Sequence, residues 1–459
     1  MAYRLPSPAE PTGGGRNIDL PEAQALNKPD THIWGVYGCL IVISIIELYS
    51  ASSFEIARQG LYNPLIRHVA MLLAGFLIIL GLQRVHYTHF VRPGFVIALL
   101  SVVAMIWVIF FGETTNGAKR SISLPFMSLQ PSEFIKLSCV LLLSYVLGTT
   151  QLKKDEKIRN RGLKWAAGIV IGAGALLITQ GLTNTLILMA LCISMLIVGS
   201  LEVKKFWYIM AVFAVAGALG VCAKITMTKL AAKEDKKQTE YVDVNGTVYI
   251  IPDLEDKKSG AGRMYDDTWL NRYLAFTDTT PRYARPLTAE NVQEQRSFMA
   301  QAHGGPFGVF PGNSRETARL PLAFSDFIYA IIIEELGLVG GMVVMLLYLW
   351  LLARAYFVAY KCSQMYPAFL VTGCALLITL QALCHMAIVT GAGPVSGQPL
   401  PLISKGGSSI LVTSIAFGIM LSVSRFAARG KDSRAEQESD KNALPAELQA
   451  ANPTQSSNR

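Results

Sequence analysis

The sequence predicts an all-α polytopic membrane protein, with about ten transmembrane helices and a large extracytoplasmic loop between the seventh and eighth. Hydrophobic residues make up 52% of the 459 residues, and charged residues make up 16%. The apolar residues gather in repeated runs close to the roughly 20-residue length that spans a bilayer. Basic residues between these runs then indicate the orientation of the chain.

Ten apolar runs are candidate spans, although the fifth and sixth could instead form one broken segment. The runs are Ile33–Ser53, Ile66–Gly81, Phe95–Phe111, Phe134–Leu147, Trp165–Ile178, Thr185–Leu201, Phe206–Cys222, Asp326–Leu352, Phe369–Val389 and Ser409–Val423. Together they define a transmembrane domain over residues 33–425. Polar tails flank it at 1–32 and 426–459, and the composition of the second tail is typical of disorder.

The orientation follows from the distribution of lysine and arginine. The fourth and fifth runs are joined by Lys153, Lys154, Lys157, Arg159, Arg161 and Lys164. The positive-inside rule makes this side cytoplasmic, and alternating spans then place both termini there as well. Residues 223–325 are therefore expected outside the cytoplasm. We interpret the formal charge of +9 as a product of topology and lipid contact, because no nucleic-acid-binding pattern occurs.

Within this external segment, residues 239–251 partly alternate around Asn245-Gly246, which predicts a β-hairpin. The hairpin could dock a partner outside the membrane or be a simple insertion. The seven cysteines lie in or beside the predicted spans and lack metal-binding spacing. They therefore favour a packing role over a metal or disulfide role.

Asp326 is the leading candidate for chemistry because it opens the eighth predicted span. An ionisable group that enters hydrocarbon is costly and usually lines a cavity or pathway. The alternative is a helix cap, since Ser325 and Asp326 are both residue types that cap N-termini.

A first polar cluster joins Asn116–Arg120 to Gln130–Lys136. Pro131 suits the first turn of a helix, with Gln130 or Ser132 at its entry. Glu133 and Lys136 are three residues apart, so they can meet on one helical face. They could form a purely structural ion pair or contribute to a site.

Two further clusters fall on the same predicted side. One precedes Asp326 and contains Gln293, Ser297 and a series of glycines up to Gly312. The other is Gly397–Ser409, whose prolines and paired glycines predict a rigid bend, with Ser408 or Ser409 capping the last helix. Lys405 in this bend could attract phosphate or snorkel to the interface.

The order of these motifs resembles the SEDS family (shape, elongation, division and sporulation), which includes FtsW and RodA. The matching positions are Tyr49–Ser52, Asn116–Arg120, Gln130–Lys136, Arg272, Gln293, Ser297, Ser325–Ile328, Glu334–Gly337 and Pro399–Ser409. The resemblance covers about residues 33–425. It implies the ten-helix fold of that family.

The resemblance also implies a peptidoglycan glycosyltransferase that polymerises lipid II at the outer face of the bacterial cytoplasmic (inner) membrane. Expected partners are a class B penicillin-binding protein, which is a transpeptidase, and other divisome membrane proteins. Asp326 matches the essential aspartate of the family and would act as the general base. The implied substrate-binding residues are Lys119, Arg120, Ser132, Glu133, Lys136, Gln293, Ser297, Lys405, Ser408 and Ser409. A divalent cation, Mg or Mn, could assist, although the sequence shows no dedicated ligand set.

Four positions depart from the family pattern. Ser121 replaces a usual Trp, Leu182 an acidic residue, His385 an Asn and Lys405 a Tyr. Lys405 and the Phe-Ser-Asp-Phe sequence around Asp326 favour the division type, FtsW, which acts at the septum, over the elongation type, RodA. Two other classes stay open: a lipid II flippase or other transporter, and a non-enzymatic scaffold of the divisome.

Overall fold

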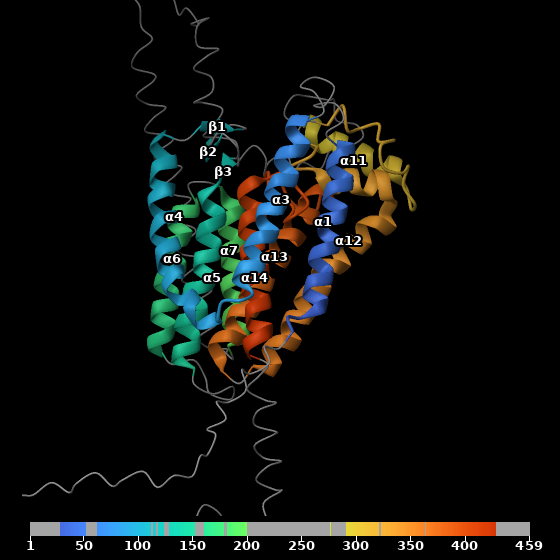
Figure 1. Cartoon of the computed structure of the whole chain (residues 1–459). Helices are drawn as coiled ribbons and strands as arrows, with labels where there is room; N and C mark the ends of the chain where they lie inside the picture. Colours follow the sequence, from blue (N-terminus) through green and yellow to red (C-terminus); the bar gives the residue numbers. More distant parts are fainter. Residues whose placement is uncertain are drawn as a thin grey trace, which may run out of the picture.

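Long apolar helices lie alongside one another and form the body of the molecule (Figure 1). The computed structural model describes residues 28–51, 62–111, 113–115, 118–123, 128–151, 160–178, 181–199, 276, 291–320, 323–362 and 364–427. Their helices are α1 Thr31–Ala51, α3 Tyr62–Leu82, α4 Val91–Phe111, α5 Pro131–Thr150, α6 Asn160–Ile178, α7 Leu182–Val198, α11 Val292–Gly304, α12 Ile328–Lys361, α13 Met365–Val389 and α14 Gly407–Ala427.

Seven of the described helices are long and apolar enough to cross a membrane, namely α1, α3, α4, α5, α12, α13 and α14. The helices α6 and α7 are shorter and also apolar. This confirms the all-α polytopic class. Nine of the ten predicted spans coincide with these helices, and the fifth and sixth are two separate ones. The seventh, 206–222, lies outside the described residues, as do the predicted hairpin at 239–251, Arg272 and residues 1–27 and 428–459 of the two tails.

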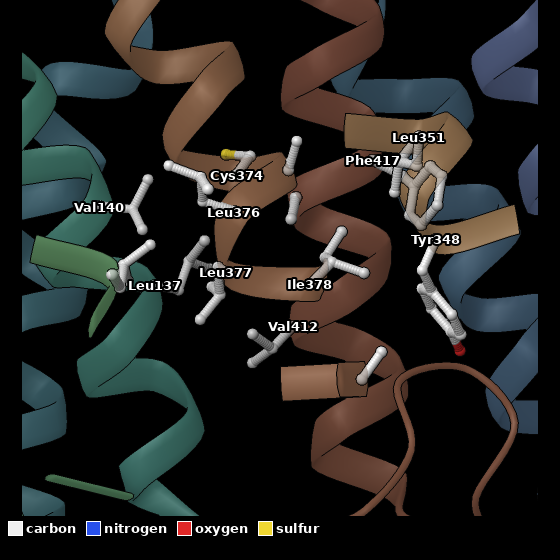
Figure 2. Close-up of a cluster of buried hydrophobic side chains, with 14 of the residues drawn as sticks. Leu137, Val140, Tyr348, Leu351, Cys374, Leu376, Leu377, Ile378, Val412 and Phe417 are labelled. Carbon is white, nitrogen blue, oxygen red and sulfur yellow. The ribbon is translucent and has the colours of Figure 1, made fainter. Parts of the chain in front are cut away.

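Helix α13 lies in the interior of the bundle, where it packs against α12, α5, α14 and α7. Leu137 of α5, Leu377 of α13 and Phe417 of α14 belong to one buried apolar cluster (Figure 2). Lipid is as apolar as leucine, so close packing and interhelical hydrogen bonds hold such helices together. The outer surfaces of α3, α4 and α12 instead expose large apolar side chains, as expected for helices that face lipid.

A small antiparallel sheet lies at the same end of the bundle as α11 (Figure 1). Its strands are β1 Glu113–Thr115, β2 Ala118–Ser123 and β3 Ser128–Leu129. The sheet links α4 to α5, and α5 begins with Pro131 at its first position, as the sequence predicts. The short 3₁₀ helix η1, Tyr87–Phe90, joins α3 to α4 at the other end of those helices.

Helix α12 is kinked at Gly337, whose φ of 73° and ψ of 179° are not helical. Residues 305–316 pass beside this kink. The amides of Val309 and Phe310 donate to the carbonyl oxygens of Glu334 and Glu335, at 3.0 and 2.8 Å. The loop therefore binds backbone groups that the kink releases from the helix.

Candidate functional site

Asp326 lies in a short non-helical segment immediately before α12. The N-cap of α12 is Phe327, which makes no capping hydrogen bond, and the first helical residue is Ile328. The N-cap position is therefore occupied by Phe327, and Asp326 lies one residue before it. Its side chain is half-buried, and Oδ1 accepts a hydrogen bond from Ser325 Oγ at 3.2 Å.

The bend at residues 399–406 lies directly against the segment that carries Asp326. The amide of Lys405 donates to the carbonyl of Phe324 at 2.9 Å, and Ser404 Oγ donates to the carbonyl of Ser325 at 2.6 Å. The Lys405 ammonium lies 4.3 Å from the centre of the Phe324 ring, within cation–π range. A carboxylate and a cation thus sit on adjoining segments that are far apart in the sequence.

The bend itself is rigidly held. Leu402 adopts a positive φ of 66°, and Ser404 Oγ accepts from the amide of Leu400 at 2.7 Å. Tyr348 of α12 donates its hydroxyl to the carbonyl of Pro401 at 2.6 Å. The predicted rigid bend is confirmed, and its support comes from α12 as well as from its own prolines.

A buried Ser–His pair lies behind the bend and is missing from the sequence prediction. Ser44 Oγ of α1 lies 2.8 Å from His68 Nε2 of α3, and Ser44 also donates to the carbonyl of Ile403 at 3.3 Å. Lys405 is near enough to His68 to act on it electrostatically. The sequence shows only that Ser44 and His68 are polar residues within two separate apolar runs, and this does not indicate that the two side chains meet.

Glu133 and Lys136 form the predicted ion pair, with Nζ 2.7 Å from Oε1 and both side chains almost completely buried. Lys136 also donates to Asn184 of α7 at 3.3 Å, and Gln381 of α13 donates to Glu133 at 3.0 Å. Each charge is therefore neutralised inside the bundle. The pair links three helices, so the geometry supports its structural interpretation in this conformation.

The predicted caps of the last helix are wrong, because α14 begins at Gly407 and includes Ser408 and Ser409 in its first turn. Ser408 Oγ instead accepts from the amide of Gln130 at 3.2 Å, which joins the start of α14 to the start of α5. Ser409 and Ser132 are buried close to these helix starts. The first and third clusters therefore meet.

Lys119 and Arg120 lie on β2, but the structure does not describe their side chains. Gln293 is half-buried at the start of α11. Ser297 is buried one turn later, where its hydroxyl donates to the carbonyl of Val389 at 3.1 Å. Ser297 thus fastens α11 to the end of α13.

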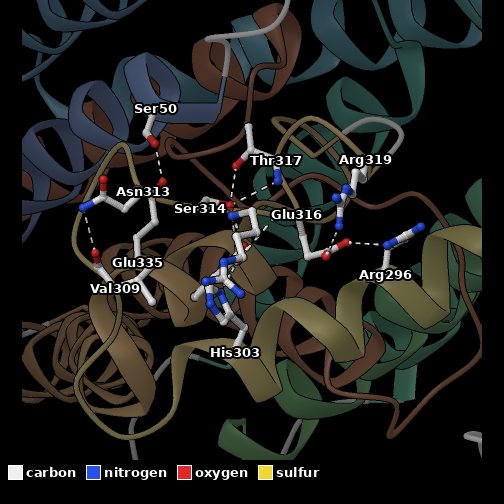
Figure 3. Close-up of polar contacts among 12 residues, drawn as sticks. Ser50, Arg296, His303, Val309, Asn313, Ser314, Glu316, Thr317, Arg319 and Glu335 are labelled. Carbon is white, nitrogen blue, oxygen red and sulfur yellow. Dashed lines mark hydrogen bonds and ion pairs between the residues drawn. The ribbon is translucent and has the colours of Figure 1, made fainter.

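Glu334 and Glu335, near the start of α12, accept hydrogen bonds from the loop before Asp326 (Figure 3). Glu334 accepts from the amide of Arg315 at 2.9 Å and from Ser314 Oγ, and His303 Nδ1 lies 2.8 Å from it. Glu335 accepts from Ser50 Oγ of α1. The start of α12 therefore organises this whole loop.

The described residues contain no group of three or more His, Cys, Asp or Glu side chains that could hold a metal ion. The arrangement offers instead an acid–base group, Asp326, with a cation, Lys405, on the neighbouring segment. These groups suit proton transfer combined with stabilisation of a developing negative charge.

One known protein family matches almost the whole helical region of the chain. The family model described as cell cycle protein, FTSW_RODA_SPOVE, matches residues 30–245 and 266–429. The chain belongs to this family. The match spans the helical bundle, the loop before α12 and the bend, and it confirms the resemblance to the SEDS proteins.

Known relatives match most of the chain. It is 26% identical over 419 residues to the probable peptidoglycan glycosyltransferase FtsW of Coxiella burnetii, covering 87% of this chain and 98% of the relative. It is 27% identical over 413 residues to the stage V sporulation protein E of Bacillus subtilis, with the same coverage.

Solved structures share the fold. The rod shape determining protein RodA of Thermus thermophilus superposes with a TM-score of 0.57 at 19% identity, covering 89% of this chain and 99% of that one. A chain from a peptidoglycan synthase complex, described for its coordination of polymerization and crosslinking, gives a TM-score of 0.59 at 21% identity, with coverage of 86% and 98%.

Proposed function

We propose that this protein is a peptidoglycan glycosyltransferase that polymerises lipid II at the outer face of the cytoplasmic membrane. The observation that carries the proposal is the position of Asp326, which is half-buried, one residue before the N-cap of α12 and beside the segment that bears Lys405. Family membership supplies the reaction class, because relatives along the whole bundle are named peptidoglycan glycosyltransferases.

In the proposed reaction Asp326 removes the proton of an acceptor sugar hydroxyl. The freed oxygen attacks the anomeric carbon of the donor chain, and the bond from that carbon to the pyrophosphate oxygen breaks. A general base of this kind contributes about 10²- to 10⁴-fold to the rate. Lys405 stabilises the negative charge that develops on the leaving pyrophosphate.

The names of the relatives favour the division type over the elongation type, since several are FtsW proteins. The proposed site of action is accordingly the septum. The proposed partner is a class B penicillin-binding protein, a transpeptidase that crosslinks the new strands. The neighbouring structure from a synthase complex that couples polymerization to crosslinking supports this pairing.

The decisive experiment is lipid II polymerisation by the purified protein in membranes, with and without its transpeptidase. Asp326→Asn should lower glycan synthesis by about 10²-fold or more, because the amide cannot accept the proton. Glu294→Gln on α11 changes a carboxylate outside the proposed site and should retain activity. An Asp326→Asn variant that folds, binds its partner and still polymerises would overturn the proposal in favour of transport or scaffolding.

Lys405 provides a second arm of this experiment. Lys405→Met keeps the length of the side chain and removes its charge, so it should lower the rate and weaken donor binding, whereas Lys405→Arg should retain much of both. Unchanged turnover and lipid II affinity in Lys405→Met would leave this lysine with an interfacial role only.

A further inference from the structure

Helix α1 carries a carboxylate on its buried face that the proposed reaction does not use. Glu47 is completely buried, and neither of its carboxylate oxygens has a hydrogen-bond partner among the described residues. An ionised carboxylate in such surroundings is strongly unfavourable, so it requires a neutralising cation or a proton.

Glu335 on α12 lies beside the face of α1 that carries Glu47. Ser50 follows Glu47 by three residues and so lies on the same face of α1. Its hydroxyl donates to Glu335 Oε1, which also accepts from the amide of Gly312 at 3.3 Å (Figure 3). The second oxygen of Glu335, Oε2, is buried without a partner among the described residues. The two carboxylates are near enough for the charge of Glu335 to disfavour ionisation of Glu47.

The neighbouring ionisable groups make hydrogen bonds of their own. Glu334 binds His303 and the amides of the loop, and its negative charge also disfavours ionisation of Glu335. On α3, His68 is bound to Ser44, and the ammonium that acts on it is Lys405 of the bend. On α14, the other helix that packs against α1, the basic residue is Arg425 in the last turn, at the far end from Gly407.

A metal ion fits this pair poorly. Magnesium keeps several of its waters and calcium takes six to eight oxygen ligands, so either ion would have to bring most of its ligands as water into this buried site. The pair offers three unpartnered carboxylate oxygens, since Glu335 Oε1 already accepts from Ser50 and Gly312. A single proton needs only two facing oxygens, and two carboxylates that share a site commonly retain one.

We propose that Glu47 and Glu335 hold one shared proton between α1 and α12 at neutral pH. One carboxyl group then donates its O–H to the other. Ser50 and the amide of Gly312 donate to Oε1 of Glu335. The protonated pair fastens α1, residues 305–316 and the start of α12 to one another. Loss of the proton places two negative charges together and separates these elements. The proposal is independent of the proposed polymerase activity.

The first test measures the stability of the full-length protein in detergent as a function of pH. The folded state holds one proton that the unfolded carboxylates release above their ordinary pKa of about 4.3, so the folding equilibrium constant should fall about tenfold per pH unit from there up to the pH at which the folded pair loses its proton. Glu47→Gln carries a neutral amide and needs no proton, so this dependence should disappear. Glu294→Gln should retain it. An unchanged pH dependence in Glu47→Gln would overturn the proposal.

The second test is infrared spectroscopy of the wild-type protein in H₂O and D₂O. A protonated buried carboxyl should give a deuterium-sensitive C=O band that Glu294→Gln keeps and Glu47→Gln loses. If Glu47→Gln does not fold, Glu335→Gln replaces it. In the wild-type protein the band should persist over the pH range in which stability falls and disappear at the pH where that fall ends. Absence of the band overturns the proposal. The proposal is also overturned if added Mg²⁺ or Na⁺ stabilises the wild-type protein but not Glu335→Gln, because that result identifies a metal site.

Discussion

Single charged residues inside the bundle have two distinct roles. Glu133 and Lys136 satisfy each other and two amide side chains, so they connect helices. Asp326 and Lys405 are instead half-buried on adjoining irregular segments, where a substrate could meet them. The degree of burial therefore separates structural charges from candidate catalytic ones here, which residue type alone does not.

This distinction predicts the outcome of a double-mutant cycle. Lys136→Met removes one member of a buried pair and leaves Glu133 uncompensated, so it should cost about 3–5 kcal/mol of stability. The double variant Glu133→Gln/Lys136→Met leaves no charge and should recover most of that loss. Chemical unfolding in detergent would measure both. A double variant as unstable as the single one would contradict the structural role.

At the residue scale, the sequence predicted which residues could carry chemistry better than it predicted which residues contact one another. Motif order predicted Asp326 and Lys405 on one side of the membrane, and the structure places their segments together. The contacts of Ser44 with His68 and of Ser50 with Glu335 escaped prediction. Each joins different helices, and no local pattern fixes how two helices are rotated against each other.

Among the elements, α12 shows how far an apolar run predicts a helix. The run predicted a span over 326–352, whereas the helix covers Ile328–Lys361. Its last turns expose Tyr356, Phe357 and Tyr360, which suit a membrane interface and extend the helix beyond the hydrocarbon core. The kink at Gly337 was not predicted, because a glycine in an apolar run, like Gly340 and Gly341 after it, is compatible with a straight helix.

The backbone conformation at the kink strongly favours glycine at position 337. A Cβ atom there would lie 2.3 Å from the carbonyl oxygen of Pro306, and the positive φ disfavours any other residue. Gly337→Ala should therefore destabilise the protein by about 1–3 kcal/mol and displace the loop that leads to Asp326. Gly172→Ala on α6 adds a methyl group where nothing lies within 4 Å, and it serves as the control. Equal melting temperatures for the two variants would contradict this role.

Considered as a whole, the molecule has different polar groups at its two ends. The loop, the bend and Asp326 lie at the end where α12 and α14 begin. At the opposite end Asp30 caps α1 through the amides of His32 and Ile33, at 2.9 and 3.2 Å. Arg354 of α12 donates to Asp30 through two nitrogens, each at 2.7 Å, so this end is also tied together.

Asp30 predicts an acid-sensitive contribution to stability. Burial opposes its ionisation, but the hydrogen bond and charge of Arg354, with the two backbone amides, lower its pKa below the ordinary value. A lowered folded-state pKa stabilises the protein above the unfolded-state pKa, and this contribution is lost as the pH falls through the folded-state value. Arg354→Gln should therefore melt below wild type at neutral pH, and the gap should shrink below about pH 4. Arg84→Gln, an exposed arginine, should show no such convergence.

The two ends also make the membrane orientation testable. Arg319 is exposed near the loop that precedes Asp326, and Lys361 is exposed at the last residue of α12. The positive-inside rule predicts that the end with Lys361 is cytoplasmic. A membrane-impermeant thiol reagent added to cells should therefore label Arg319→Cys directly, and should label Lys361→Cys only after permeabilisation. Each signal is compared with the background labelling of the parent chain, which has an exposed Cys39. Labelling in the reverse order would place Asp326 on the cytoplasmic side. It would then be separated from any substrate outside the membrane, because α12 begins two residues after Asp326 and ends at Lys361.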